Sequence, residues 1–264
     1  MQDLNINLVQ CPLAWEDIDA NLDNFSNILS RLSRPSDLIV LPEMFNTGFT
    51  MNAESNFEEM DGMTMAWMAK MAMAKDCVLC GSMIIREKGN FYNRFVWMRP
   101  DQSYEYYDKK HLFRMGDEHL HYAAGSNKLV VTLKGWKVMP LICYDLRFPV
   151  WSKNLFAGGE YSFDLLLYVA NWPAVRSAAW NTLLRARSIE NMAYVAGVNR
   201  TGIDGRGYEY GGGSVVAAPD GSVLCQGNEF PETLVQCKLQ WAPLDEIRGK
   251  LGVGRDWDGF DIHH

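Results

Sequence analysis

The sequence lacks the features of a membrane or exported protein. No stretch approaches the ~18 consecutive apolar residues that span a bilayer. The first residues, MQDLNINLVQC, have neither the basic flank nor the long apolar run of a signal peptide. We therefore expect a cytoplasmic protein that does not bind a membrane.

Cysteine is also sparse, with six in 264 residues, too few for a disulfide scaffold. In the cytosol these thiols should be reduced, so each is available for the core or for chemistry. Cys77 and Cys80 have a zinc-like spacing, but no second Cys/His pair is placed to complete four ligands. They lie in an apparent core strand, so we expect packing there and no metal site.

No cluster of one charge sign is present. The formal net charge is −7, and the scattered lysines and arginines form no basic patch of the kind that binds nucleic acid. We find no Ser/Pro-rich linker, charge block or internal repeat, which favours a single domain over residues 1–264. Hydrophobic residues make up 48% of the chain, enough for a sizeable core. A small-molecule ligand is the expected partner.

Periodicity predicts alternating strands and helices, and hence an α/β fold. Leu4, Ile6 and Leu8 alternate as in a strand, and apolar residues recur at helical spacing from Ile18 to Leu32. Further helices are predicted over 63–73 and from about 180 to 191. Strands are predicted in DLIVLPE, CVLCGSMII, the two halves of NFYNRFVWMRPDQSYEYYDKK, the hairpin LVVTLKGWKVMPLICYD, FDLLLYVANWP, AYVAGVN and, as the last strands, GGGSVVAAPDGSVLCQG. The mixed segment HLFRMGDEHLHYAAGSN reads as a surface loop.

Polar residues follow three of these strands. Glu43, the pair Lys109 and Lys110, and Cys143 each come just after an apolar run. Ligands of open α/β sheets bind outside the carboxyl ends of the strands. If the strands are neighbours, an acid, a base and a thiol converge on one cleft.

That combination suits nucleophilic catalysis on a carbonyl. Cysteine attacks as the thiolate, for which Glu43 would be the base if burial raises its pKa. A lysine and the backbone N–H of Tyr144 would stabilise the oxyanion. Each residue alone also fits a structural role, as a buried thiol, a helix-start acid or a solvated lysine pair. Their common position after apolar strands favours a shared catalytic site over three separate structural roles.

The motifs LPEMFNTGF, YDKKHLF and ICYDLRFP, in this order, resemble the Glu, Lys and Cys motifs of the nitrilase superfamily of carbon–nitrogen hydrolases. The similarity extends to ANWPAVRSAAWNTLLRARSIENMAYVAGVNRTG and GGGSVVAAPDG, and so covers nearly the whole chain. The resemblance implies a four-layer α-β-β-α sandwich, a homodimer formed through helices that flank the sheets, and a Glu-Lys-Cys site that needs no cofactor.

The resemblance also implies residue roles. It places the catalytic lysine at Lys109, with Asp108 in place of the usual arginine and Lys110 at a variable position. The family often has a second acid after the lysine that helps to position the substrate or the lysine. The pattern of similar amidases favours Glu118 over Asp117 for this role. Glu118 could instead be a solvated loop acid.

The residues after the cysteine indicate a branch. Nitrile-cleaving members usually continue with Trp-Glu and carbamoylase-like members with Asn-Asp-Arg, whereas CYDLRFP resembles the ω-amidases, which hydrolyse 2-oxoglutaramate and related ω-amides of dicarboxylates. A substrate carboxylate needs a cationic partner, and Arg147 and Arg176 are candidates because guanidinium binds carboxylate bidentately. Either arginine could instead pair with Asp145 or cap a helix.

Three other functions remain open. The protein could be another amidase, nitrile hydrolase or carbamoyl hydrolase of the family. It could be a thioesterase or protease in which His111, His119 or His121 is the base, although all three lie in one segment and His111 belongs to the lysine motif. It could also be a binding or scaffold protein that has lost the reaction, although no residue needed for the chemistry is missing.

Overall fold

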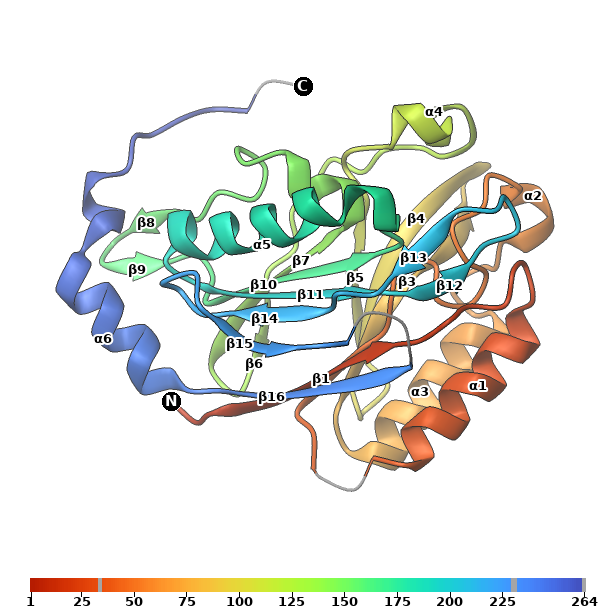
Figure 1. The fold of residues 1–264 in the computed structure, drawn as a ribbon, viewed down its shortest axis with the longest axis horizontal. Helices are drawn as coiled ribbons and strands as arrows, with labels where there is room; N and C mark the ends of the chain where they lie inside the picture. The colour runs from red at the N-terminus through yellow and green to blue at the C-terminus, as the bar shows by residue number, and fades with distance from the viewer. Residues whose placement is uncertain (33–34, 229–231, 263–264) are drawn as a thin grey trace.

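Two six-stranded sheets form the centre of the protein in a computed structural model, which describes residues 1–32, 35–228 and 232–262 (Figure 1). The first sheet has the order β16-β1-β2-β3-β4-β5 and the second has the order β15-β14-β11-β10-β7-β6. The strands of the first sheet are β1 (Leu4–Gln10), β2 (Leu38–Val40), β3 (Val78–Glu87), β4 (Asn90–Met98), β5 (Tyr104–Asp108) and β16 (Thr233–Leu239). Those of the second are β6 (Val131–Leu133), β7 (Trp136–Ile142), β10 (Leu165–Ala170), β11 (Tyr194–Asn199), β14 (Val215–Ala217) and β15 (Val223–Gln226).

Strand direction determines where the site can form. β1, β2 and β3 are parallel, and two antiparallel pairings, β3 with β4 and β4 with β5, return β5 to the direction of β2. In the second sheet β7, β10 and β11 are parallel and almost entirely buried, as is usual for parallel strands. The carboxyl ends of β2 and β5 therefore lie at the same end of the first sheet.

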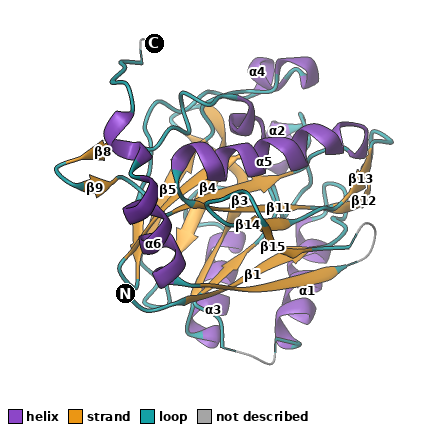
Figure 2. Ribbon diagram, turned by 60° about the vertical axis from the view of Figure 1, so that its left-hand side comes forward, coloured by secondary structure: helices purple, strands orange, loops and turns teal. Residues whose placement is uncertain are grey.

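Helices cover the outer face of each sheet (Figure 2). The described helices are α1 (Ile18–Ser30), α2 (Ala53–Asn56), α3 (Met63–Lys75), α4 (Glu118–His121), α5 (Ser177–Asn191) and α6 (Trp241–Leu251). Short 3-10 turns are η1 (Arg114–Gly116), η2 (Cys143–Arg147), η3 (Ala174–Arg176) and η4 (Val253–Asp256), and small hairpins are β8 (Phe156–Ala157) with β9 (Glu160–Tyr161) and β12 (Thr201–Ile203) with β13 (Glu209–Gly211). None of the described helices is long and apolar enough to cross a membrane.

The core has two main parts. Side chains such as Leu38 and Val40 of β2 face the second sheet and share one apolar cluster with Leu141 and Leu167. Ile39, which points the other way, belongs to a second cluster with α1 and α3. Met65 and Met68 of α3 belong to this second cluster, whereas Met63 and Met73 are exposed. The four layers α-β-β-α predicted from the family resemblance are confirmed.

α5 packs closely on the second sheet. A side chain at Gly197 of β11 would place its Cβ 2.7 Å from a methyl carbon of Leu184 and 2.8 Å from the ring of Trp180. Glycine is therefore required for this close approach. The predicted helix from Trp180 to Asn191 agrees with α5.

Two predictions about the elements are wrong. The segment HLFRMGDEHLHYAAGSN is not only a surface loop, because it contains η1 and α4 and contributes a buried acid. GGGSVVAAPDGSVLCQG does not hold the last strands, since β16 and α6 follow it. In β16, Val235, Cys237 and Leu239 alternate inward between exposed residues, the period-2 pattern of a half-buried strand. His263 and His264 of the terminal WDGFDIHH lie outside the described residues.

Candidate active site

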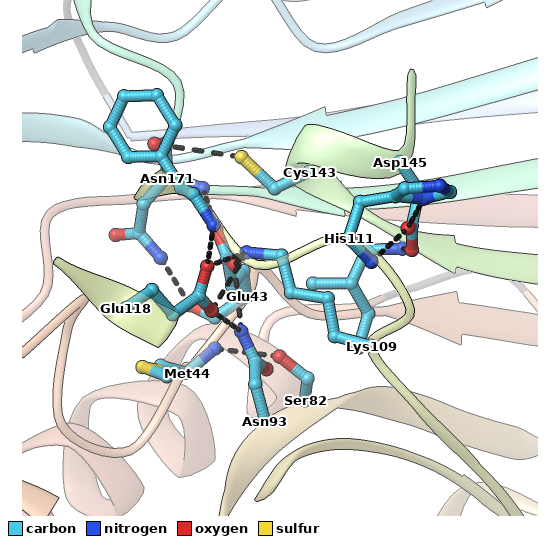
Figure 3. A network of polar contacts seen from close by, with 12 residues as sticks. Glu43, Met44, Ser82, Asn93, Lys109, His111, Glu118, Cys143, Asp145 and Asn171 are labelled. Atoms are coloured by element: carbon cyan, nitrogen blue, oxygen red, sulfur yellow. Dashed lines mark hydrogen bonds and ion pairs between the residues drawn. The ribbon is translucent and has the colours of Figure 1, made fainter. Parts of the chain in front are cut away.

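Glu43, Lys109 and Cys143 meet at one end of the sandwich, just beyond β2, β5 and β7 (Figure 3). They do not come from neighbouring strands of an open sheet, the arrangement considered from the sequence. β2 and β5 belong to one sheet and β7 to the other, so the sandwich brings the thiol from across the interface between the sheets.

Lys109 lies between two carboxylates. Its Nζ is 2.8 Å from Oε1 of Glu43 and 3.0 Å from both carboxylate oxygens of Glu118, and all three side chains are fully buried. Burial alone would lower the pKa of Lys109, but the charges of Glu118 and Glu43 outweigh it and raise the pKa. The lysine is thus a fixed cation.

Lys110 has a different environment. Its side chain is half-buried, with Nζ 5.5 Å from the centre of the Trp151 ring. It does not line the cavity around Cys143. The structure therefore places Lys109, the residue chosen from the family pattern, between the glutamates.

Glu118 is not a solvated loop acid. It is 0% exposed, and besides Lys109 its carboxylate accepts hydrogen bonds from the N–H of Phe113 (2.6 Å) and from Asn93 Nδ2 (3.3 Å). Burial raises the pKa of Glu118, the nearby charge of Glu43 adds to this, and Lys109 opposes it. A hydrogen-bonded, buried carboxylate of this kind holds the lysine in place.

Both oxygens of the Glu43 carboxylate are used. Oε1 accepts from Lys109 and from Asn93 Nδ2 (2.8 Å), and Oε2 accepts from the backbone N–H of Asn171 (2.8 Å). The Asn171 side chain donates to the Glu43 carbonyl at 2.5 Å. Asn171 follows β10 of the second sheet, so it ties Glu43 to the sheet that carries Cys143.

Cys143 begins η2 directly after β7, with φ at +41°. A left-handed backbone is unfavourable for a residue with a Cβ, and such conformations are concentrated at functional sites. Its Sγ lies 3.9 Å from the carbonyl oxygen of Asn171. Burial, followed by the charge of Glu43, raises the pKa of Cys143 well above its ordinary value, while Lys109 opposes the shift. Cys143 is therefore a protonated thiol beside a carboxylate.

Asp145 anchors the turn that carries Cys143. It is 0% exposed, and its Oδ2 accepts from the Tyr107 hydroxyl (2.8 Å) and from the Ile142 N–H (3.1 Å). Its Oδ1 accepts from the N–H of His111 (3.0 Å) and lies 2.8 Å from His111 Nδ1. These contacts join η2 to the segment just after Lys109, and so fix Cys143 relative to Lys109.

A cavity of about 110 Å³ opens over Cys143 and Lys109. Its other lining residues are mainly aromatic or carry guanidinium groups: Phe49, Phe113, Tyr144, Trp172, Tyr208 and Tyr210 with Arg147, Arg176 and Arg206. None of His111, His119 and His121 lines it. The cavity can hold a small ligand next to Cys143.

Of the predicted substrate-binding residues, Tyr144, Arg147 and Arg176 line this cavity, whereas Glu118 does not. The N–H of Tyr144 lies in the first turn of η2, where a 3-10 helix supplies no partner for it. Arg147 is exposed and lies 4.9 Å from the centre of the Trp172 ring; it does not pair with Asp145. Arg176 contacts Met115 Sδ at 3.7 Å and lies over the Phe113 ring.

We did not predict from the sequence that Asn93, Asn171 and Arg206 belong to the candidate site. Asn171 follows the apolar strand LLLYVA, the same position that pointed to Glu43 and Cys143, so this signal was available. Asn93 is a lone buried amide in the aromatic strand β4, a weaker signal. Arg206 lies in the glycine-rich segment DGRGYEY, which carries no period at all.

Cys77, just before β3, and Cys80, within it, are both buried in the core. Within the described ranges, no group of three or more His, Cys, Asp or Glu side chains is arranged to hold a metal.

The sequence pattern of the family described as Carbon-nitrogen hydrolase matches residues 5–248. The chain is 45% identical to Omega-amidase YafV of Escherichia coli K12 over 99% of this chain and 100% of that protein. It is 31% identical to the 2-oxoglutaramate amidase of Bacillus subtilis 168, over 95% and 96% of the two chains. The crystal structure of XC1258 from Xanthomonas campestris, a CN-hydrolase superfamily protein with an arsenic adduct in its active site, superposes with a TM-score of 0.97 at 44% identity over the whole of both chains. This chain belongs to the carbon–nitrogen hydrolase family.

Proposed function

We propose that this protein hydrolyses the terminal amide of small ω-amides that carry a carboxylate, such as 2-oxoglutaramate or 2-oxosuccinamate, to the acid and ammonia. The observation that carries the proposal is a buried Glu43–Lys109–Glu118 set beside the Cys143 thiol, under a cavity with arginines in its wall. The names of the curated relatives support the same substrate class.

In the first step Glu43 takes the proton of Cys143 as the sulfur attacks the amide carbon. The raised pKa of Cys143 makes such a base necessary, because little thiolate exists at neutral pH. The tetrahedral oxyanion is stabilised by Lys109 and by the Tyr144 N–H. Glu43 then gives the proton to the leaving nitrogen, ammonia departs, and a thioester links the acyl group to Cys143.

In the second step Glu43 removes a proton from a water molecule that attacks the thioester carbon. The sulfur leaves and recovers its proton from Glu43, and the product acid is released. Both carboxylate oxygens of Glu118 lie 3.0 Å from Lys109 Nζ, so we assign Glu118 the task of holding the lysine toward the oxyanion.

Arg147 and Arg176 would bind the carboxylate at the far end of the substrate. Neither has an ion-pair partner among the described residues. Their aromatic neighbours Trp172 and Phe113 restrict the guanidinium groups without neutralising them.

The test is ammonia release from a panel containing 2-oxoglutaramate, 2-oxosuccinamate, glutamine, asparagine, a simple nitrile and a carbamoyl amino acid. We expect the highest kcat/KM on the 2-oxo ω-amides and no turnover by Cys143→Ala. Activity confined to the nitrile or the carbamoyl amino acid would overturn the proposed branch.

The Cys-His alternative is tested by replacing His111, His119 and His121 one at a time with Gln. We expect His119 and His121 to be dispensable and His111→Gln to act only through the turn that Asp145 holds. The Cys-His alternative would be favoured if one of these histidine variants lost the pH-dependent limb of its kcat profile while Glu43→Gln remained active. A binding protein without activity would form no acyl adduct with any amide in the panel.

We further propose that the chain is one domain, a homodimer and cytoplasmic. The apolar cluster shared by the two sheets supports one domain. Ile189 of the outer helix α5 is 52% exposed, and Val175 of η3, just before this helix, is 85% exposed. These exposed apolar side chains support pairing through a helix that flanks a sheet. Light scattering of the purified protein tests the dimer, and a uniform monomer at micromolar concentration would refute it.

A further inference from the structure

The hairpin β12–β13 forms one wall of the cavity, and the reaction described above makes no use of it. Asp204, Arg206, Tyr208 and Tyr210 of this hairpin line the cavity with Cys143. The hairpin packs against η3, the turn that carries Arg176. A third arginine therefore lies in the wall that faces the substrate.

The tip of the hairpin is held by one buried acid. Asp204 is 6% exposed; its Oδ1 accepts from the N–H groups of Arg206 and Tyr208, both at 2.9 Å, and its Oδ2 accepts from the Tyr210 hydroxyl at 2.8 Å. Backbone bonds from Gly207 N–H to the Asp204 carbonyl, and from Asp204 N–H to the Tyr208 carbonyl, close the turn. Arg206 is thus set on a pre-formed loop, with its guanidinium 5.7 Å from the centre of the Tyr208 ring.

The base of the hairpin is fixed as well. Arg200 is 0% exposed and donates to the carbonyl oxygens of Thr201 and Leu13, with its guanidinium 4.7 Å from the centre of the Tyr210 ring. A loop fixed at both ends loses little entropy when a ligand binds, which suits it to a recognition role.

The charges around the cavity favour an anion. The formal net charge of the protein is −7, yet its cavity wall carries three guanidinium groups and one acid. Among the described residues none of Arg147, Arg176 and Arg206 forms a salt bridge, whereas six other arginines do. The one acid, Asp204, already accepts three hydrogen bonds within the hairpin. The cavity wall is therefore left with uncompensated positive charge.

We propose that Arg206 is a specificity-determining residue that binds the substrate carboxylate distal to the scissile amide, and that Asp204 is a positioning residue that fixes Arg206 for this role. The proposal rests on the proposed function, since it assumes an ω-amide substrate with a free carboxylate. Arg206 would complete a set with Arg147 and Arg176 that surrounds the carboxylate from separate elements, whereas the scissile amide meets Cys143 and Lys109.

The experiment compares kcat and KM for 2-oxoglutaramate and for pentanamide, which has the same chain length and no carboxylate. In Arg206→Gln we expect KM for 2-oxoglutaramate to rise roughly 10- to 100-fold, the loss typical of a hydrogen bond to a charged group. The values for pentanamide should stay unchanged. Arg206→Lys should restore part of the affinity because it keeps the charge without the bidentate geometry.

Asp204→Asn tests the positioning role, because it replaces one acceptor by a donor while keeping the shape. We expect the ratio of kcat/KM for the two substrates to shift in the same direction as in Arg206→Gln, and by less. If Asp204 had a purely structural role, Asp204→Asn would lower kcat/KM for both substrates by the same factor and leave their ratio unchanged. Arg255→Ala is the control, because it removes an exposed arginine that lines a different hollow. It should leave kcat and KM unchanged for both substrates.

Two outcomes separate this inference from the proposed function. If the wild-type enzyme shows no preference for 2-oxoglutaramate over pentanamide, the proposed function fails and this inference fails with it. If the wild-type enzyme shows the preference and Arg206→Gln retains it, the proposed function stands and the assignment of Arg206 is wrong.

Discussion

Replacing Lys109 by Met removes the cation between two buried carboxylates while keeping most of the volume. Lys109 Nζ contacts Glu43 at 2.8 Å and both oxygens of Glu118 at 3.0 Å, and none of the three side chains is exposed. Breaking a buried ion pair by removing one partner costs about 3–5 kcal/mol, because an uncompensated charge is left behind. We expect the free energy of unfolding to fall by that amount.

In the proposed mechanism the same change also removes an oxyanion donor. Losing one such donor lowers kcat by roughly 10²- to 10³-fold. Turnover of Lys109→Met should therefore be nearly abolished, measured by ammonia release, while urea unfolding reports the stability. Lys110→Met is the matched control, since that side chain lies outside the cavity; it should keep both activity and stability near the wild-type values.

A second variant separates the two losses. Lys109→Met combined with Glu118→Gln removes one of the two carboxylates, so it should recover part of the lost stability and none of the activity. A folded Lys109→Met protein with near-normal turnover, or equal losses from Lys109→Met and Lys110→Met, would refute the assignment.

The remaining predictions concern Asp145, Cys143 and alkaline stability. Asp145→Asn places an amide N–H₂ group against the N–H and O–H groups that donate hydrogen bonds to the carboxylate. The free energy of unfolding should therefore fall by about 1–3 kcal/mol. An unchanged free energy of unfolding would contradict the anchoring role. Because the pKa of Cys143 is raised, its thiolate fraction is small at neutral pH, and its alkylation by iodoacetamide, followed by peptide mass spectrometry, should be slow at pH 7 and accelerate above pH 9. Rapid, pH-independent labelling at pH 7 would instead indicate a thiolate. The pKa of Lys109 is higher in the folded than in the unfolded chain, so the folded state holds more protons above about pH 10.4, and the free energy of unfolding should fall as pH rises beyond that value. In Lys109→Met this alkaline slope should be shallower, and an identical slope would show that other groups cause it.

The position of polar residues after apolar strands pointed to two residues of the candidate site. Glu43 and Cys143 each follow an apolar run that the structure confirms as β2 and β7. This signal is local, because the run, its end and the polar residue lie within a few positions of one another. The choice of Lys109 over Lys110 came from the family pattern. Hydrophobic periodicity could not distinguish the two lysines, because they are adjacent and lie on an irregular segment.

What the sequence could not give depends on contacts between distant segments. Glu118 is buried at the start of α4 with its carboxylate against Lys109, although its segment is polar and irregular in sequence. Asp145 acts through Tyr107 and His111, which lie 38 and 34 residues away. The pairing of two sheets, which brings Cys143 to Glu43, leaves no mark in the apolar runs themselves, because a strand buried on both faces looks the same in either sheet. Arg206 is positioned by the hydrogen bonds of Asp204, which no periodicity reports.

The central claim is that Cys143 carries the acyl group of an ω-amide as a thioester. Acid quenching of the enzyme during turnover of 2-oxoglutaramate, followed by peptide mass spectrometry, tests this directly. We expect a mass gain equal to the substrate minus ammonia on the peptide that contains Cys143, and no such gain in Cys143→Ala. Turnover with no adduct on that peptide, or an adduct on another residue, would contradict the account.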